Sequence, residues 1–159
     1  MVDITEISAI IAAAGVLVGV VYYILDMRHQ SRARQTDLIM RLHSQASSKE
    51  FVEAYQKAVN VKFSDYKDFV EKYGSLFTEG PEQTAILMCA MFMEGLGVLL
   101  HKKLVDVETI QELFPVENAW KKFKPIVIGI RTKGNLESYK WFEYLYNEMK
   151  KREQKRTTS

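Results

Sequence analysis

The stretch ISAIIAAAGVLVGVVYYIL, residues 7–25, contains no charged side chain. Nineteen residues at about 1.5 Å each form a helix of roughly 28 Å, which is close to the hydrocarbon thickness of a bilayer. Tyr22 and Tyr23 lie near its end, where aromatic side chains suit the headgroup region. We therefore predict that residues 1–27 form a transmembrane anchor.

A cleaved signal peptide and a helix buried in a soluble domain are the two alternatives. A signal peptide begins with basic residues and ends in small ones. Here Asp3 and Glu6 precede the apolar run, and the alanines 12–14 lie inside it. A buried helix of a soluble domain usually keeps a polar stripe, which this stretch lacks. The sequence favours a retained anchor.

Arginines set the predicted orientation of the anchor. Arg28, Arg32 and Arg34 follow the apolar stretch, whereas acidic residues precede it. Because basic residues accumulate on the cytoplasmic side of membrane helices, we expect the N-terminus outside the cell membrane and the rest of the chain in the cytoplasm. The three arginines would then contact lipid headgroups.

Small residues mark one face of the predicted anchor. Ser8, Ala12, Gly15 and Gly19 are spaced by four, three and four residues, and this spacing places them on one side of a helix. Small residues allow two membrane helices to approach closely. We predict a helix–helix interface there, with either a second copy of the chain or another membrane protein as the partner.

The remaining sequence predicts an all-α protein, in which the anchor continues into a cytoplasmic helical bundle. We expect a basic juxtamembrane helix over residues 28–46, a helical domain over 47–150 and a basic disordered tail over 151–159. The 22 basic and 20 acidic residues give a net charge of only +2, so no nucleic-acid partner is expected. The single cysteine excludes an intramolecular disulfide.

Local signals define the helices of this domain. Ser47 and Ser64 are predicted N-caps, and Gly74 is a predicted helix stop. Pro81 suits the first position of a helix, and Asp106 begins a short one. The stretch PIVIGI, residues 125–130, could be a short strand, but no strong second strand exists to pair with it, so a helix is favoured.

Residues 85–100 could form a second span, because Glu94 is their only charged side chain. A central carboxylate disfavours insertion by about 2.5–3.5 kcal/mol, so we predict a core helix instead. Glu94 and Arg131 are then the predicted buried polar residues. We prefer an ion pair between them, with Lys103 or a tyrosine hydroxyl as alternative partners of Glu94 and a catalytic role as the less favoured reading.

The order of segments resembles an uncharacterised domain-of-unknown-function family of small membrane-anchored helical proteins. An apolar N-terminal helix and a basic extension precede FMEGLGVLLHKKLVDVETIQELF, AWKKFKPIVIGIR and YKWFEYLYNEM. These are packing patterns, so the resemblance implies the architecture and adds no activity.

No catalytic motif stands out, and we expect no catalytic residue, cofactor or metal. The histidines His29, His43 and His101 are scattered, without a partner at ligand spacing. We expect a single-pass membrane-anchored module for interaction, scaffolding or regulation. The alternative is a membrane-tethered enzyme or small-ligand sensor with a pocket near Glu94. A closed core would favour the interaction module. An open pocket lined by Glu94, Arg131 and tyrosines would favour the enzyme or sensor.

Overall fold

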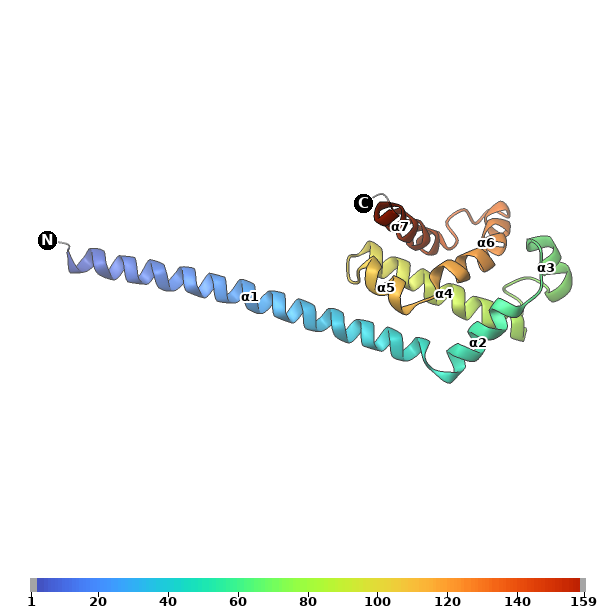
Figure 1. Cartoon of the computed structure of the whole chain (residues 1–159), viewed down its shortest axis with the longest axis horizontal. Helices are drawn as coiled ribbons and strands as arrows, with labels where there is room; N and C mark the ends of the chain where they lie inside the picture. The colour runs from blue at the N-terminus through green and yellow to red at the C-terminus, as the bar shows by residue number, and fades with distance from the viewer. Residues whose placement is uncertain (1–2, 158–159) are drawn as a thin grey trace. The chain divides into compact units, whose positions relative to one another are not determined.

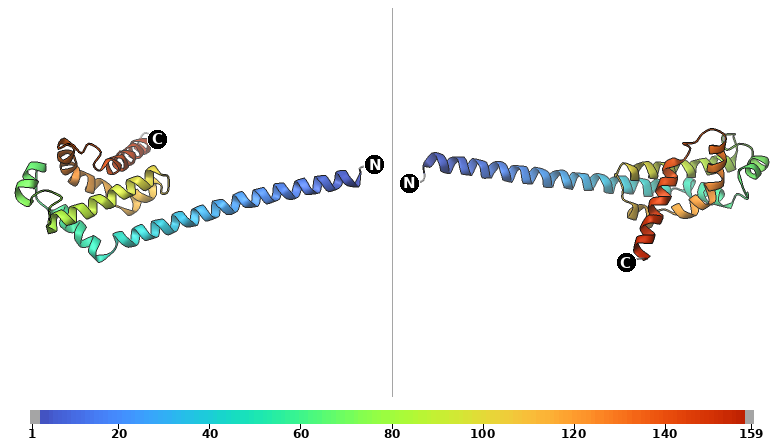
Figure 2. Two further views of the ribbon diagram at one scale, coloured as in Figure 1. Left: turned by 180° about the vertical axis from the view of Figure 1, so that it is seen from behind. Right: turned by 90° about the horizontal axis from the view of Figure 1, so that it is seen from above.

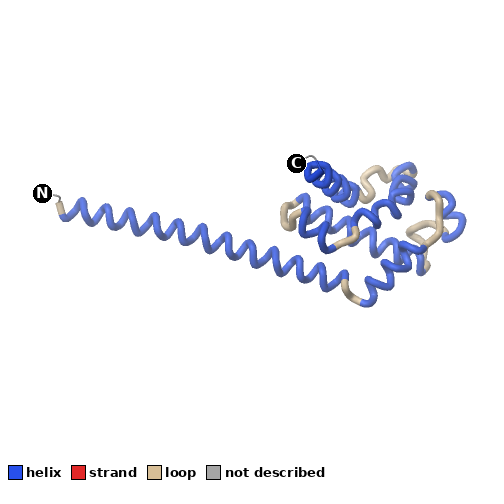
Figure 3. Tube along the Cα trace, viewed as in Figure 1, coloured by secondary structure: helices blue, strands red, loops and turns tan. Residues whose placement is uncertain are grey.

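In the computed structural model, the described residues 3–157 form seven helices and no strand (Figures 1 and 3). Of residues 4–12 and 157 only the backbone is described. The predicted all-α fold is confirmed. The helices are α1 (Ile4–Ala46), α2 (Lys49–Asn60), α3 (Tyr66–Tyr73), α4 (Pro81–His101), α5 (Val107–Leu113), α6 (Val116–Thr132) and α7 (Lys140–Thr157).

The chain divides into two compact units, residues 1–41 and 42–159. The first unit is most of α1, an unbroken helix of 43 residues that is about 64 Å long at the usual rise per residue. No proline or other breaker interrupts α1 where the apolar sequence changes to a basic one. The unit boundary falls inside the segment 28–46 that was predicted as a juxtamembrane helix.

The second unit is a bundle arranged around α4 (Figure 2). Helix α2 packs on one side of α4, whereas α6 and α7 pack on the other, and α3 lies against α6. Phenylalanine, leucine, isoleucine and methionine side chains fill the core, including Phe69, Ile86, Met93, Phe123 and Phe142. Such side chains supply about 1.5–3 kcal/mol each when they are buried.

Helix α4 is apolar almost all round, as expected for a helix at the centre of a domain. Cys89 is completely buried in it, and burial raises the pKa of its thiol to about 12. Among the described residues, α4 is the one helix whose length and composition would suit a membrane, and 39% of its apolar stretch is buried inside the domain. Its contacts with α2, α6 and α7 explain its apolar character.

Two predicted N-caps are wrong by one residue. The backbone N–H of Phe51 donates to Ser48 rather than to Ser47, and the N-cap of α3 is Asp65 rather than Ser64. In both cases two capping residues stand next to each other in the sequence. Asp65 is the N-cap because its carboxylate accepts the backbone N–H of Asp68 at 2.9 Å. In return, the Asp68 carboxylate accepts the backbone N–H of Ser64 at the same distance.

Other predicted helix starts and ends are confirmed. Gly74 ends α3 with a φ of 86°, a left-handed conformation that favours glycine. Pro81 begins α4, and Asp106 caps α5 by accepting the N–H of Thr109 at 2.8 Å. The PIVIGI stretch is helical, and Pro125 lies inside α6.

The prediction of a disordered tail from residue 151 is wrong for residues 151–157, which continue α7. Ion pairs explain the extra turns of helix. Arg152 and Arg156 both pair with Glu108, and Lys150 bonds to Glu117 at 2.9 Å and to Glu153 at 2.8 Å. The tail is basic, but Arg152 and Arg156 pair with an acidic residue of α5.

Candidate functional site

The described part of the α1 apolar stretch exposes its large side chains to solvent. Val16 is 67% exposed and Tyr22 is 71% exposed, and the run of exposed apolar residues extends to Leu25. Monomeric soluble proteins rarely expose a continuous apolar surface of this kind. The predicted headgroup residues Arg28, Arg32 and Arg34 follow on the same helix and are also exposed.

The predicted small-residue face of α1 is only partly described. A Cβ atom added at Gly15 or Gly19 would meet no atom within 4 Å, so this surface is open. The side chains of Ser8 and Ala12 lie outside the described part of the structure. The helix–helix interface stays a prediction.

Glu94 joins α4 to the start of α7. Its carboxylate accepts the backbone N–H of Phe142 at 2.7 Å and that of Trp141 at 3.3 Å. These N–H groups belong to the first turn of α7, where a helix offers no carbonyl to accept them. The negative charge also complements the positive end of the helix dipole. Glu94 therefore acts as an N-cap that comes from another helix.

The preferred Glu94–Arg131 ion pair is wrong. Arg131 donates to the carbonyl of Ser138 at 2.9 Å and to the carboxylate of Glu143 at 2.6 Å. Both partners come from the turn between α6 and α7 and from the first turn of α7, so the contact is local. Glu94 and Arg131 are half-buried rather than buried. The two residues bind neighbouring parts of the same helix terminus.

Gly97 is a packing residue that sequence analysis missed. A Cβ atom at this position would overlap the carbonyl group of Trp141, so glycine permits the close crossing of α4 and α7. One turn later, the His101 ring lies 4.2 Å from the Trp141 ring. Glu94, Gly97 and His101 thus share one face of α4 at helical spacing, and this was the signal that could have identified the contact.

Tyr139 completes this α4–α7 junction. Its backbone adopts a φ of 54°, and its pKa is raised by burial and by the charge of Glu94. Five grooves of the described structure are lined by side chains other than Glu94. The alternative prediction of a pocket near Glu94 stays a prediction. The carboxylate is engaged in helix capping.

An uncharged groove follows α4 on its side toward α2. We call it the methionine groove; its lining includes Phe51, Met88, Met91, Gly95 and Leu99. Met88 is 41% exposed and Met91 is 62% exposed, whereas a Cβ atom at Gly95 would meet nothing within 4 Å. The groove therefore has flexible apolar walls and an open position between them.

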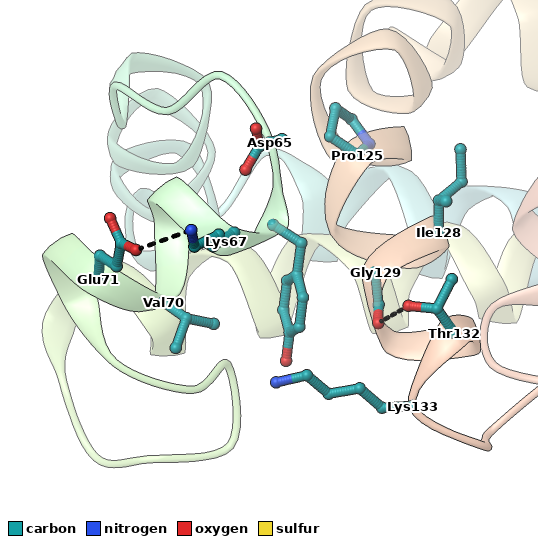
Figure 4. Close-up of a pocket in the computed structure, with 10 residues that line it drawn as sticks. Asp65, Lys67, Val70, Glu71, Pro125, Ile128, Gly129, Thr132 and Lys133 are labelled. Atoms are coloured by element: carbon teal, nitrogen blue, oxygen red, sulfur yellow. Dashed lines mark hydrogen bonds and ion pairs between the residues drawn. The ribbon is translucent and has the colours of Figure 1, made fainter.

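A second groove, of about 610 Å³, lies between α3 and α6 (Figure 4). Val70, Lys67 and Glu71 line the α3 side, and Ile128 and Thr132 belong to the α6 side. We call it the α3–α6 groove. Within the described residues, no group of three or more His, Cys, Asp or Glu side chains is arranged to hold a metal ion.

A comparison with protein-family models confirms the predicted resemblance to an uncharacterised domain-of-unknown-function family. The family model called Domain of unknown function (DUF4760) matches residues 9–149, which is most of the chain. Neither a search of curated proteins nor a search of solved structures gave a match. By the extent of the family match, the chain belongs to the family Domain of unknown function (DUF4760).

Proposed function

We propose that this chain is a single-pass membrane protein that displays a helical interaction module in the cytoplasm. The exposed apolar surface of α1 carries the proposal, because residues 16–25 present large apolar side chains without a packing partner in their unit. Burial of such side chains in lipid is favourable by about 25 cal/mol for each Å² of apolar surface. The arginines that follow favour an N-terminus outside the cell.

The methionine groove is the surface of the module that we assign to partner binding. Its lining contains no charged residue, so it suits an apolar side chain from a helix of another protein or of a second copy. Methionine side chains adapt their shape to different partners. The open position at Gly95 would let a helix backbone approach α4.

Cysteine labelling of the full-length chain in intact cells tests the topology. A cysteine in place of Asp3 should react with an impermeant thiol reagent from outside, and a cysteine in place of Ser159 should react only after the cells are opened. The native Cys89 is buried and has a raised thiol pKa, so it should add little background. The reverse labelling pattern would contradict the proposal.

Photocrosslinking in native membranes tests the docking surface. A photoreactive residue in place of Met91 should form a defined crosslinked species. The matched control is the same residue at Lys124, which is exposed on α6 and does not line the methionine groove. Equal crosslinking at both positions, or none at Met91, would show that the groove does not bind a partner.

A further inference from the structure

Lys133 at one end of the α3–α6 groove carries a charge that no carboxylate neutralises within the described structure. Its amino group lies 4.9 Å from the centre of the Tyr66 ring, a cation–π contact that leaves its N–H donors available. By comparison, Lys121 and Lys151 each have an acidic partner. Lys133 is therefore a cation beside an apolar groove.

The acidic residues of the same groove are already engaged. Asp65 caps α3 through the N–H of Asp68, and Glu71 lies 3.7 Å from Lys67. Figure 4 shows Lys133 at the opposite end of the groove from Asp65. A ligand anion at Lys133 would thus meet one cation and would lie away from the nearest capping carboxylate.

The walls between these ends are apolar and preformed. Val70 from α3 and Ile128 from α6, which is 48% exposed, line the two sides. Gly129 lets the Tyr66 side chain pack directly on α6, because a Cβ atom there would overlap it. The Thr132 hydroxyl donates to the Gly129 carbonyl at 2.8 Å and can still accept a hydrogen bond.

We infer that the α3–α6 groove binds an amphipathic monocarboxylate, with the apolar body against Val70, the Tyr66 ring and Ile128 and the carboxylate on the Lys133 amino group. A single lysine matches a single negative charge. Both a free organic acid and the C-terminal carboxylate of an apolar peptide have this chemistry. The inference does not depend on the membrane anchor.

Binding measurements with charged and neutral probes test this site. We would titrate the full-length chain in lipid nanodiscs with 4-phenylbutanoate and with 4-phenylbutanamide, and subtract binding to empty nanodiscs. The carboxylate should bind about tenfold more tightly, which corresponds to about 1.4 kcal/mol. N-acetyl-Leu-Phe and its C-terminal amide form the second arm; tighter binding of the peptide acid than of 4-phenylbutanoate would identify a chain terminus as the source.

Two variants locate the binding site. Lys133→Gln should abolish the preference for the carboxylate and leave the domain folded, because Lys133 is exposed. Lys124→Gln removes an exposed lysine of α6 that does not line this groove and should keep the preference. Equal binding of acid and amide by the parent, a preference that survives in Lys133→Gln, or no binding of any probe at millimolar concentration would each overturn the inference.

Discussion

The two most apolar stretches of the chain have similar compositions but different surroundings. In α1, side chains from Val16 to Leu25 are exposed, whereas in α4 the side chains of Ile86, Cys89 and Met93 are buried among other helices. The α4 stretch contains Glu94 and Gly97, each of which contacts α7. Glu94 and Gly97, through their contacts with α7, therefore identify α4 as a core helix, which its hydropathy alone does not.

The largest expected effect comes from charges placed in the α1 stretch. Leu17→Arg combined with Val21→Arg should remove the chain from the membrane fraction, because each arginine disfavours insertion by about 2.5–3.5 kcal/mol. Alkaline extraction of membranes measures the retained fraction. Met91→Arg, on the exposed side of α4, is the matched control and should leave retention unchanged. A double variant that resists extraction like the parent would contradict anchoring by α1.

The two glycines of α4 provide a matched pair for the core helix. Gly97→Ala should destabilise the domain by about 1–3 kcal/mol, because the new methyl group overlaps the Trp141 carbonyl. Gly95→Ala faces open space and should stabilise the helix by about 0.5–1 kcal/mol. Urea unfolding of the full-length chain in detergent, followed by tryptophan fluorescence, measures both. Equal effects of the two substitutions would show that α4 and α7 do not cross closely at Gly97.

Substitutions of Glu94 test the second contact between α4 and α7, in which its carboxylate accepts backbone N–H groups of α7. Glu94→Ala should destabilise the domain by about 1–2 kcal/mol, because two N–H groups at the start of α7 lose their acceptor. Glu94→Gln should lose only part of this, since its amide oxygen can still accept one N–H. Unfolding in urea again gives the free energies. Exposed Glu112 is the control, and its replacement by alanine should change stability by less than about 0.5 kcal/mol. A Glu94→Ala chain as stable as the parent would remove the capping role.

The smallest expected effect concerns association of α1. Gly15→Ile with Gly19→Ile keeps the stretch apolar, so membrane retention should not change, but the crosslinked dimer should decrease several-fold. Isoleucine at Leu17 and Val18, off that face, should leave crosslinking unchanged. Association in lipid depends on close packing, and the open space at both glycines allows it. Persistent crosslinking in the double variant would assign any dimer to the cytoplasmic helices.

Local features of the fold could be predicted from the sequence, because they depend on neighbouring residues. Gly74, Pro81 and Asp106 were identified correctly from turn and cap preferences. The predicted N-caps of α2 and α3 lie one residue before the observed ones. The reason is that Ser47–Ser48 and Ser64–Asp65 each offer two capping side chains. Helix-capping chemistry alone does not choose between such neighbours.

Contacts between distant segments were harder to predict. The importance of Glu94 followed from its apolar neighbours, but its acceptance of backbone N–H groups depends on where α7 begins. Arg131 was predicted to pair with Glu94, whereas the turn that joins α6 to α7 brings it to Glu143 in the first turn of α7. The different surroundings of Gly95 and Gly97 depend on the crossing of α4 with α7, which the sequence does not give.

We propose that α1 crosses the membrane and that α4 does not. Single cysteines in place of Glu79 and Lys102, which are exposed at the two ends of α4, test it in the full-length chain alongside a cysteine at Asp3. An impermeant reagent should label the Asp3 position from outside intact cells. The reagent should reach both α4 positions only after the cells are opened. Labelling of Glu79 and Lys102 from opposite sides of the membrane would show instead that α4 crosses it.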